Sequence, residues 1–299
     1  MMKPLEAINI KKNFGNKEIL KGIDFSLTSG EICGFIGRNG AGKSTFINII
    51  TGIMRTSSGT IKLFGNDTHI EHKKLGVLPD YSTFYNDMSG MQHIKYFAKI
   101  NGVNPSKDLI YDYASKLGIE KDLNKKVKTY SFGMKKKLGV IQAVIHDPDL
   151  IFLDEPTSGV DIESALKIHS LLNELKEKGK TILVTSHNLD EIEKICDRIA
   201  ILKEGLLVHF GTMDQIRSHH RSTYDVNIQH SEISEDKIRS LQVDFNKISS
   251  NFSINSQKTN LEVKSDDEIA HFIKILVRND VNVFRLNVSE PTLEEMFLS

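Results

Sequence analysis

The chain has 299 residues, 39% of them hydrophobic, and its 39 Lys and Arg balance its 39 Asp and Glu to a formal net charge of zero. This length allows one large domain or two smaller ones, each with an ordinary hydrophobic core, as is typical of a globular protein. A net charge of zero gives nucleic acid and anionic membrane surfaces no general attraction. We therefore expect no nucleic-acid partner.

Cysteine usage and hydropathy indicate a reducing, non-membrane environment. Cys33 lies in an expected strand and Cys196 in an expected helix, which favours buried free thiols over a disulfide. There is no charged-then-apolar leader, and no apolar run approaches the roughly 18 residues that a spanning helix needs. The expected location is cytoplasmic, and action at a membrane would require another chain to supply the crossing.

Up to about residue 215, short apolar strands alternate with helical segments, which is the pattern of an α/β fold. The expected strands span residues 31–36, 75–78, 150–153, 181–185 and 199–202. Between residues 79 and 130 helical spacing takes over: Ser89 and Gln92 form a capping box before one helix, and a second helix ends at Gly118. The first helix carries Ile94, Phe97 and Ala98, and the second carries Leu109, Ile110, Tyr113 and Leu117 on one face. The sequence therefore predicts a helical insertion at about residues 80–146.

A glycine-rich loop follows the first of these strands and precedes an apolar helix. Its glycines let the backbone curl until successive N–H groups converge, and the following helix points its positive end at the same place. Lys43 can reach the outer phosphates of a bound nucleotide, and the Ser44 hydroxyl can ligate Mg²⁺. A nucleoside triphosphate with Mg²⁺ is therefore expected at this loop, held by Gly37, Arg38, Asn39, Gly40, Ala41, Gly42, Lys43, Ser44 and Thr45.

The apolar strand at 150–153 ends in two acids, Asp154 and Glu155, and the turn at 158–161 follows after Pro156. The first carboxylate lies at the carboxyl edge of the sheet, beside the phosphate loop, where Asp154 can hold the metal through water. Glu155, one residue on, can face the γ-phosphate and accept a proton from the attacking water.

Three further segments surround these motifs. Residues 130–135 read YSFGMK at the start of an expected helix, which Ser131 can cap. Residues 181–187 read TILVTSH, an apolar strand that ends at His187, and Phe14 precedes the phosphate loop. With these motifs in this order, residues 3–215 resemble the nucleotide-binding subunit of ATP-binding cassette (ABC) transporters. The resemblance implies a P-loop NTPase cassette core that hydrolyses ATP.

The resemblance also implies individual roles. In the family, the signature helix covers the γ-phosphate bound by the opposite subunit, so Ser131 and Gly133 are candidate nucleotide-binding residues. His187 would contact the γ-phosphate, Phe14 would stack on adenine, and Asp161 would belong to the loop that joins the two active sites of a dimer. Judged alone, a histidine that ends an apolar strand and an aromatic at position 14 could equally be structural residues.

Two departures from the family pattern are evident. Asp80 stands where most relatives carry glutamine; its carboxylate can bind Mg²⁺, but it is one methylene shorter, which puts its reach to the attacking water in doubt. Phe132 and Met134 replace the commonest glycine and glutamine of the signature. Ser131 and Gly133 are retained, so a working site is expected.

After Gly211 the pattern changes again through the polar stretch at 217–222, and we expect a domain boundary after residue 215. Residues 216–299 read as strand 224–229, helix 235–241, strands 251–255 and 260–264, helix 267–278 and strand 281–288. This order predicts a small accessory α+β domain of the split βαβ kind. The adjacent His219 and His220 could indicate a metal, although two histidines without a third ligand are usual in a solvated linker. This C-terminal domain, which ends in residues 291–298, resembles a tail attached to ATPases of small-molecule exporters, including those for drugs or peptide antibiotics.

The expected function is that of the ATPase subunit of a membrane transporter. Two cassettes, in a homodimer or a paired arrangement, would sandwich ATP head to tail and drive separate transmembrane permease subunits, in the direction of export. The chain would then lie at the inner face of the membrane through its permease. Alternatives are an importer ATPase, a soluble cassette ATPase acting in translation or DNA repair, and a P-loop kinase or GTPase. The last leaves Ser131, Gly133 and His187 unexplained.

Overall fold

The computed structural model describes residues 3–66, 72–80, 84–220, 223–248 and 251–289, together with Leu293. Its contacts divide the chain into two compact units, Met1–Met213 and Asp214–Ser299. The boundary expected from the sequence follows residue 215. Each unit has its own hydrophobic core.

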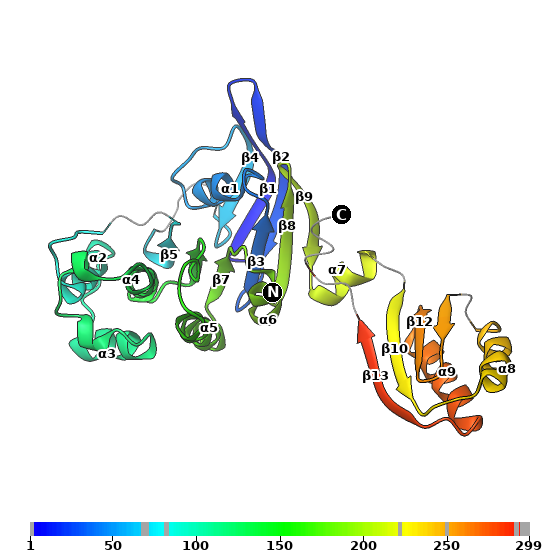
Figure 1. The fold of residues 1–299 in the computed structure, drawn as a ribbon. Coiled ribbons are helices and arrows are strands. Elements are labelled where there is room, and N and C mark those ends of the chain that lie inside the picture. Colours follow the sequence, from blue (N-terminus) through cyan, green and yellow to red (C-terminus); the bar gives the residue numbers. More distant parts are fainter. Residues whose placement is uncertain are drawn as a thin grey trace. The chain divides into compact units, whose positions relative to one another are not determined.

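The first unit is built on a six-stranded sheet with the strand order β5-β6-β7-β3-β8-β9 (Figure 1). The strands are β3 (Ile32–Gly37), β5 (Leu75–Leu78), β6 (Leu150–Leu153), β7 (Thr181–Val184), β8 (Arg198–Lys203) and β9 (Leu206–Gly211). All pairings are parallel except that of β9 with β8. Every residue of β6 and β7 is buried, which explains their continuous apolar runs. The carboxyl ends of the five parallel strands therefore share one edge of the sheet.

A three-stranded antiparallel sheet, ordered β2-β1-β4, forms a second layer that the expected elements do not include. Its strands are β1 (Leu5–Phe14), β2 (Lys17–Leu27) and β4 (Ser58–Leu63). Helix α1 (Lys43–Ile50) is packed against both sheets through Phe46, whose ring centroid lies 5.6 Å from that of Phe25 in β2 and 4.9 Å from that of Phe35 in β3. This aromatic core fixes where α1 begins, directly after the glycine-rich loop.

The helical insertion is confirmed. It contains α2 (Gly90–Ile100), α3 (Lys107–Lys116) and α4 (Phe132–Val144), and the chain continues through α5 (Ile162–Glu177) and α6 (Leu189–Ile195). The capping box of Ser89 and Gln92 is present at the start of α2. Two details differ from the expectation: Leu109 is 40% exposed although it fits the helical spacing of its buried neighbours, and Cys196 follows α6 instead of lying inside it. Cys33 is buried in β3, and both thiols are free.

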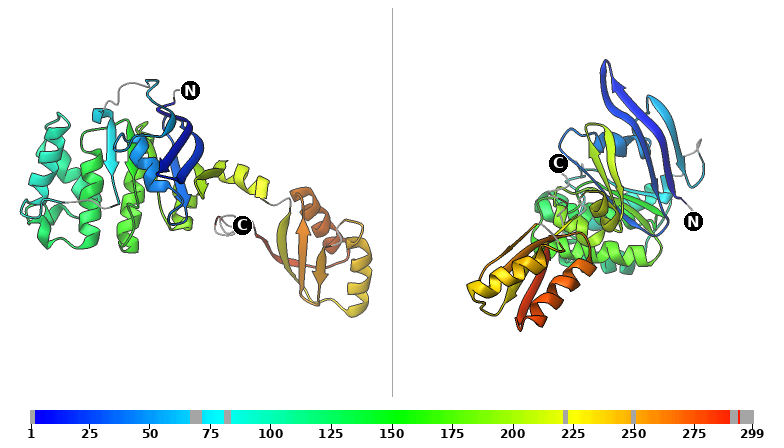
Figure 2. Two further views of the ribbon diagram at one scale, coloured as in Figure 1. Left: turned by 90° about the horizontal axis from the view of Figure 1, so that it is seen from above. Right: turned by 90° about the vertical axis from the view of Figure 1, so that its right-hand side faces the viewer.

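The second unit has the predicted split βαβ topology. Its elements are β10 (Tyr224–His230), α8 (Glu235–Phe245), β11 (Phe252–Ile254), β12 (Lys258–Val263), α9 (Asp266–Arg278) and β13 (Val283–Ser289). The strands form an antiparallel sheet in the order β11-β12-β10-β13 (Figure 2). Alternate residues such as Val226 and Ile228 pack with Phe245 of α8 and Phe272 of α9 in one core.

The segment that joins the two units is more ordered than the sequence indicates. Helix α7 runs from Met213 to His220, so the polar stretch expected as a linker begins inside a helix. The side chains of His219 and His220 lie outside the described part of the chain, as does the tail at 291–298 apart from Leu293.

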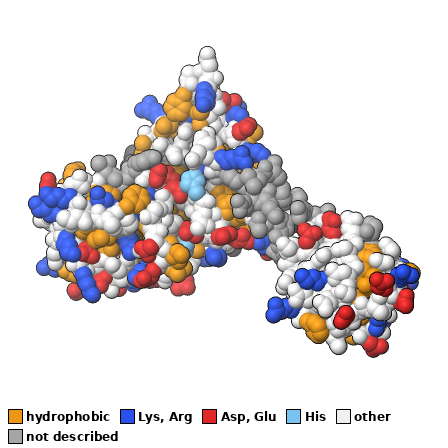
Figure 3. All heavy atoms as spheres, viewed as in Figure 1, with side chains coloured by type: hydrophobic (Ala, Val, Ile, Leu, Met, Phe, Trp, Pro, Cys, Tyr) orange, Lys and Arg blue, Asp and Glu red, His pale blue; other side chains and the backbone are white. Residues whose placement is uncertain are grey.

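Two expectations about composition can be compared with the described residues. Within those ranges, no helix combines the length and the apolar character that a bilayer crossing requires, and no three His, Cys, Asp or Glu side chains form a group that could hold a metal ion by themselves. Acidic and basic side chains are interspersed over the face of the first unit drawn in Figure 3, in keeping with the balanced net charge.

A chain that ends after Arg217 is expected to fold without the second unit. The reason is that the large core of the first unit contains only residues before that position. Circular dichroism should show a single cooperative thermal transition near that of the first unit in the full chain. A truncated chain that lacks this transition would show that the two units form one folding unit.

Candidate nucleotide-binding site

A cleft of about 330 Å³ lies where the carboxyl ends of the parallel strands meet the glycine-rich loop. Eleven of the candidate residues from the sequence line this cleft: Phe14, Asn39, Gly40, Gly42, Lys43, Ser44, Thr45, Asp80, Asp154, Glu155 and His187. Lys17 and Ile19, at the start of β2, complete the wall and were not anticipated. Segments from five parts of the chain thus converge on one site.

The second unit carries a larger hollow, of about 470 Å³, over the open face of its sheet. Its lining includes the amides of Asn227, Asn260 and Asn287 and the carboxylates of Asp225 and Glu262, but no Lys, Arg or His among the described residues. Because it lacks both a cation and a glycine-rich loop, this hollow does not suit a polyphosphate. The smaller cleft of the first unit is the candidate site.

The phosphate loop connects β3 to α1. Gly42, the N-cap of α1, has a φ of 112°, which L side chains rarely adopt. A Cβ atom at Gly37 would lie 2.6 Å from the carbonyl oxygen of Leu202, so the close approach of β3 and β8 requires a glycine there. These two glycines permit the tight curl that aims the backbone N–H groups of the loop and of the first turn of α1 into the cleft.

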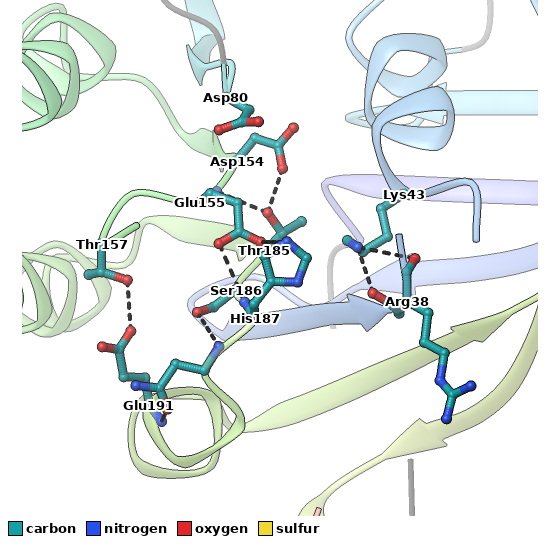
Figure 4. Close-up of polar contacts among 12 residues, drawn as sticks. Arg38, Lys43, Asp80, Asp154, Glu155, Thr157, Thr185, Ser186, His187 and Glu191 are labelled. Atoms are coloured by element: carbon teal, nitrogen blue, oxygen red, sulfur yellow. Dashed lines mark hydrogen bonds and ion pairs between the residues drawn. The ribbon is translucent and has the colours of Figure 1, made fainter. Parts of the chain in front are cut away.

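Lys43 is 8% exposed and donates from Nζ to the carbonyl oxygens of Gly37, at 2.6 Å, and of Arg38, at 3.5 Å (Figure 4). Burial lowers the pKa of Lys43, while the carboxylates of Glu155 and Asp154 oppose that shift. The ammonium is therefore held at the floor of the loop, opposite the acids. The side chain of Arg38 points away from those acids, and Arg38 is not among the residues that line the cleft.

The two acids after β6 are held by one hydroxyl. Thr185 donates from Oγ1 to Asp154 Oδ1 at 2.5 Å and accepts from the backbone N–H of Glu155 at 3.0 Å. Asp154 and Glu155 are each 6% exposed. Thr185 lies at the end of β7, next to β6 in the sheet, so strand pairing places the hydroxyl between the acids. The sequence signal for it was a hydroxyl residue two positions before His187.

Glu155 faces His187 across the cleft. Its Oε1 lies 3.2 Å from His187 Nε2, and its Oε2 accepts from the His187 backbone N–H at 3.3 Å. Burial raises the pKa of the Glu155 carboxyl, and the neighbouring His187 partly offsets this rise. Oε1 is buried and accepts no hydrogen bond within the described ranges. A buried carboxylate with a raised pKa and an unfilled acceptor is suited to receive a proton.

Asp80 follows β5 and is paired with a residue that the sequence reading passed over. Lys136 of α4 lies 3.4 Å from Asp80 Oδ1 and donates to the Glu155 carbonyl oxygen at 2.9 Å. The position of Lys136 within three consecutive lysines gave no sign that it is buried. Asp80, Asp154 and Glu155 nevertheless line one cleft, as the metal-site prediction requires for Asp80 and Asp154.

Ser131, Gly133 and Asp161 do not line this cleft. Ser131 caps α4 by accepting from the Met134 N–H at 3.2 Å, and Asp161 caps α5 by accepting from Ser164. These hydrogen bonds lower the pKa of Asp161. Helix α4 begins beside the turn that leads to α5, since a Cβ at Gly133 would lie 3.6 Å from Val160 Cγ1. The three residues thus belong to a surface apart from the phosphate loop of the same chain.

Phe14 ends β1 and is 50% exposed, so it is not part of the core. It lines the cleft, and Lys12 Nζ lies 5.1 Å from its ring centroid. An exposed aromatic face at the rim of a phosphate-binding cleft is suited to stack on a base.

A second unanticipated contact connects the segment after Glu155 with α6. Thr157 donates from Oγ1 to Glu191 Oε2 at 2.7 Å, and His169 of α5 lies 3.5 Å from the same oxygen (Figure 4). The helix that follows His187 is therefore attached to the segment that follows Glu155.

The donor set fits a magnesium nucleotide. Carboxylates, a hydroxyl at Ser44 and the buried Oε1 of Glu155 are the oxygen ligands and water-positioning groups that Mg²⁺ and a phosphate-bound water require. Lys43 and the N-terminus of α1 supply the opposing positive charge.

The sequence of this chain is similar to those of known ATP-binding proteins. The family model described as ABC transporter matches residues 20–158. The linearmycin resistance ATP-binding protein LnrL of Bacillus subtilis is 33% identical to this chain. The alignment includes 99% of this chain and 97% of LnrL. The bacitracin transport ATP-binding protein BcrA of Enterococcus faecalis is 30% identical, and the alignment includes 98% of this chain and 94% of BcrA.

Solved structures match the first unit. An ATP-binding subunit of an ABC transporter is 28% identical with a TM-score of 0.67, over 73% of this chain and 93% of that chain. The ADP conformation of the ATP-binding cassette MJ1267 is 25% identical with a TM-score of 0.63, over 72% of this chain and 93% of that chain. The phosphate loop, the paired acids and the cassette fold are thus joined in one chain, which belongs to the ATP-binding proteins of ABC transporters and is an ABC-type ATPase.

Proposed function

We propose that this ATPase powers the export of antibiotic-like small molecules through separate permease subunits. The observation that carries the proposal is the extent of the match to LnrL and BcrA, which includes the second unit, with 99% and 98% of this chain aligned. The cassette structures align with only about three quarters of it. The chain therefore shares its additional unit with relatives named for linearmycin resistance and bacitracin transport.

In the proposed reaction the loop N–H groups and Lys43 bind the β- and γ-phosphates of ATP, and Phe14 stacks on adenine. Bound Mg²⁺, held by Ser44, Asp154 and Asp80, would neutralise charge on the phosphates. Glu155 accepts a proton from the attacking water, and the His187 ring beside it contacts the γ-phosphate.

The surface that carries Ser131, Gly133 and Asp161 has a place in this scheme. Because these residues do not line the cleft of their own chain, they support a head-to-tail dimer. In such a dimer, the helix end formed by Ser131 and Gly133 of a second copy would cover the γ-phosphate. ATP binding would then close the dimer and hydrolysis would reopen it.

A groove in the first unit is suited to receive the permease. It has a volume of about 200 Å³ and lies between the helical insertion and the core, lined by Thr51, Leu75, Val77, Phe97, Asn101, Gln142, Ala143 and His146. Ile100, Tyr85 and Tyr96, all in the same insertion, are exposed beside it, and the two tyrosine rings meet edge to face. Strand β5 runs from this groove to Asp80, so a permease segment seated there would contact the strand that leads into the active site. The chain would thereby be held at the inner face of the membrane.

Glu155→Gln and Asp154→Asn are expected to fail in different ways. Glu155→Gln keeps the shape and removes the proton acceptor, so ATP should bind and the closed dimer should accumulate while turnover falls. Asp154→Asn should weaken the Mg²⁺ dependence of ATP binding itself. Steady-state ATPase assays and size exclusion with ATP distinguish the two variants, and wild-type turnover in Glu155→Gln would contradict the assigned role.

Lys43→Ala and Phe14→Ala are expected to discriminate between nucleotides. In the proposed site Lys43 contacts the phosphates, so its loss should weaken the binding of ATP more than the binding of adenosine. Phe14→Ala should weaken ATP, ADP and AMP alike, by about 1 to 3 kcal/mol if stacking resembles that in nucleic-acid complexes. Isothermal titration measures both patterns, and unchanged ADP affinity in Phe14→Ala would rule out base stacking.

Tyr96→Glu is expected to uncouple the ATPase from its permease, because it places a charge beside the groove. Leu109→Glu is the matched control, since the two residues are 41% and 40% exposed on helices of the same insertion. The ATPase activity of both purified variants should stay at the wild-type level. Only Tyr96→Glu should lose the permease during purification in mild detergent and lose resistance to bacitracin or linearmycin in cells. Retention of both by Tyr96→Glu would exclude this docking surface, and faster uptake instead of efflux would indicate an importer.

A further inference from the structure

Lys136 is a buried lysine at the junction of three segments. It lies on α4 and is 5% exposed, a burial that a lysine tolerates only when its charge is paired. Its Nζ lies 2.9 Å from the carbonyl oxygen of Glu155 and 3.4 Å from both the carbonyl oxygen and Oδ1 of Asp80. An ammonium group has three N–H donors, and here three acceptors surround it.

Lys136 contacts Glu155, whose backbone conformation is unusual. Glu155 has a φ of 53°, in the left-handed region that a residue with a Cβ atom rarely adopts. Its N–H donates to Thr185, and its carbonyl oxygen accepts from Lys136 at 2.9 Å and from the Ser158 N–H at 3.3 Å. Because the shorter of the two hydrogen bonds to this carbonyl comes from Lys136, we expect the direction of the Glu155 carboxylate to depend on Lys136.

The contact of Lys136 with Asp80 offsets negative charge at the cleft. Asp80, Asp154 and Glu155 place three carboxylates on one cleft, into which a polyphosphate would bring further negative charge. Lys136 approaches Asp80 from behind the cleft wall, since it is not among the lining residues. It therefore offsets the extra acid at position 80 without occupying space in the cleft.

We propose that Lys136 is a positioning residue for ATP hydrolysis, which fixes the backbone of Glu155 and the loop of Asp80 to the start of α4. This inference rests on the proposed role of Glu155. It also implies a coupling: a displacement of the strand end after β5 is transmitted through Asp80 and Lys136 to Glu155.

The test compares Lys136→Met with its control Lys180→Met. Methionine matches the lysine side chain as far as Cε and removes the charged amino group with its donors. Lys180 is also buried, at 9% exposure, and also binds a carboxylate and a backbone carbonyl, those of Asp147, away from the nucleotide cleft. Comparable losses in melting temperature are expected for the two variants. Only Lys136→Met should lose kcat, by on the order of 10- to 100-fold, as expected when a catalytic group is displaced.

The separation of kcat from binding identifies a positioning role. In Lys136→Met, KM for ATP and the affinity for a fluorescent ATP analogue without Mg²⁺ should stay within about threefold of wild type. Lys136→Gln keeps a neutral N–H donor for the Glu155 carbonyl oxygen and leaves Asp80 unchanged. This variant should retain at least about tenfold more kcat than Lys136→Met, because the contact that positions Glu155 is kept.

Several results would overturn the proposal. These are a wild-type kcat in Lys136→Met, equal losses of kcat in Lys136→Met and Lys180→Met, or a folded Lys136→Gln with no more kcat than Lys136→Met. If Lys136→Met does not fold, Lys136→Gln takes its place in the comparison with Lys180→Met, by the same kcat and KM. Glu155→Gln, assayed in parallel, separates the two hypotheses. An inactive Glu155→Gln beside a fully active Lys136→Met rejects only the role of Lys136, whereas an active Glu155→Gln rejects the role of Glu155 itself.

Discussion

The active-site geometry depends on one buried hydroxyl. Thr185 is completely buried at the end of β7, donates to Asp154 and accepts from the N–H of Glu155. In the sheet, β7 lies between β6, which carries the acids, and β3, which carries the phosphate loop. A change of strand register would therefore separate the acids from Lys43 and carry His187 away from Glu155. The parallel pairing of three strands thus sets the chemistry of the cleft.

Charge is arranged so that binding and hydrolysis use different contacts. Lys43 is held by its own loop and lines the cleft, whereas Glu155 is held through its backbone and lies beside His187. Burial raises the pKa of Glu155 and lowers that of Lys43, while the neighbouring opposite charges oppose both shifts. A mutation can consequently remove turnover and leave ATP affinity intact.

Local motifs made much of this site predictable. The phosphate loop and the acids after β6 are contiguous in sequence, so spacing alone indicates their roles. The split βαβ topology followed from element order. The antiparallel sheet of β1, β2 and β4 was overlooked, although the alternation of Ile23, Phe25 and Leu27 in β2 is a strand signal.

What could not be predicted depends on contacts distant in sequence. Lys136 and Asp80 meet because α4 packs on β5. From the sequence, one of three consecutive lysines would be expected to be a solvated surface residue. Leu109 shows the converse, because helical spacing placed it on a buried face and the structure exposes it. Periodicity identifies a helix, but the partners of that helix decide which of its residues are buried.

Ser131 and Gly133 lie outside the cleft of their own chain, so in the proposed dimer one chain binds ATP but two are needed to hydrolyse it. The most direct test is the ATPase rate per subunit, measured at saturating Mg²⁺ and ATP over a wide range of protein concentration. The account predicts that the rate per subunit rises with concentration until the dimer is saturated. A rate per subunit that stays constant down to concentrations at which the chain is monomeric would contradict it.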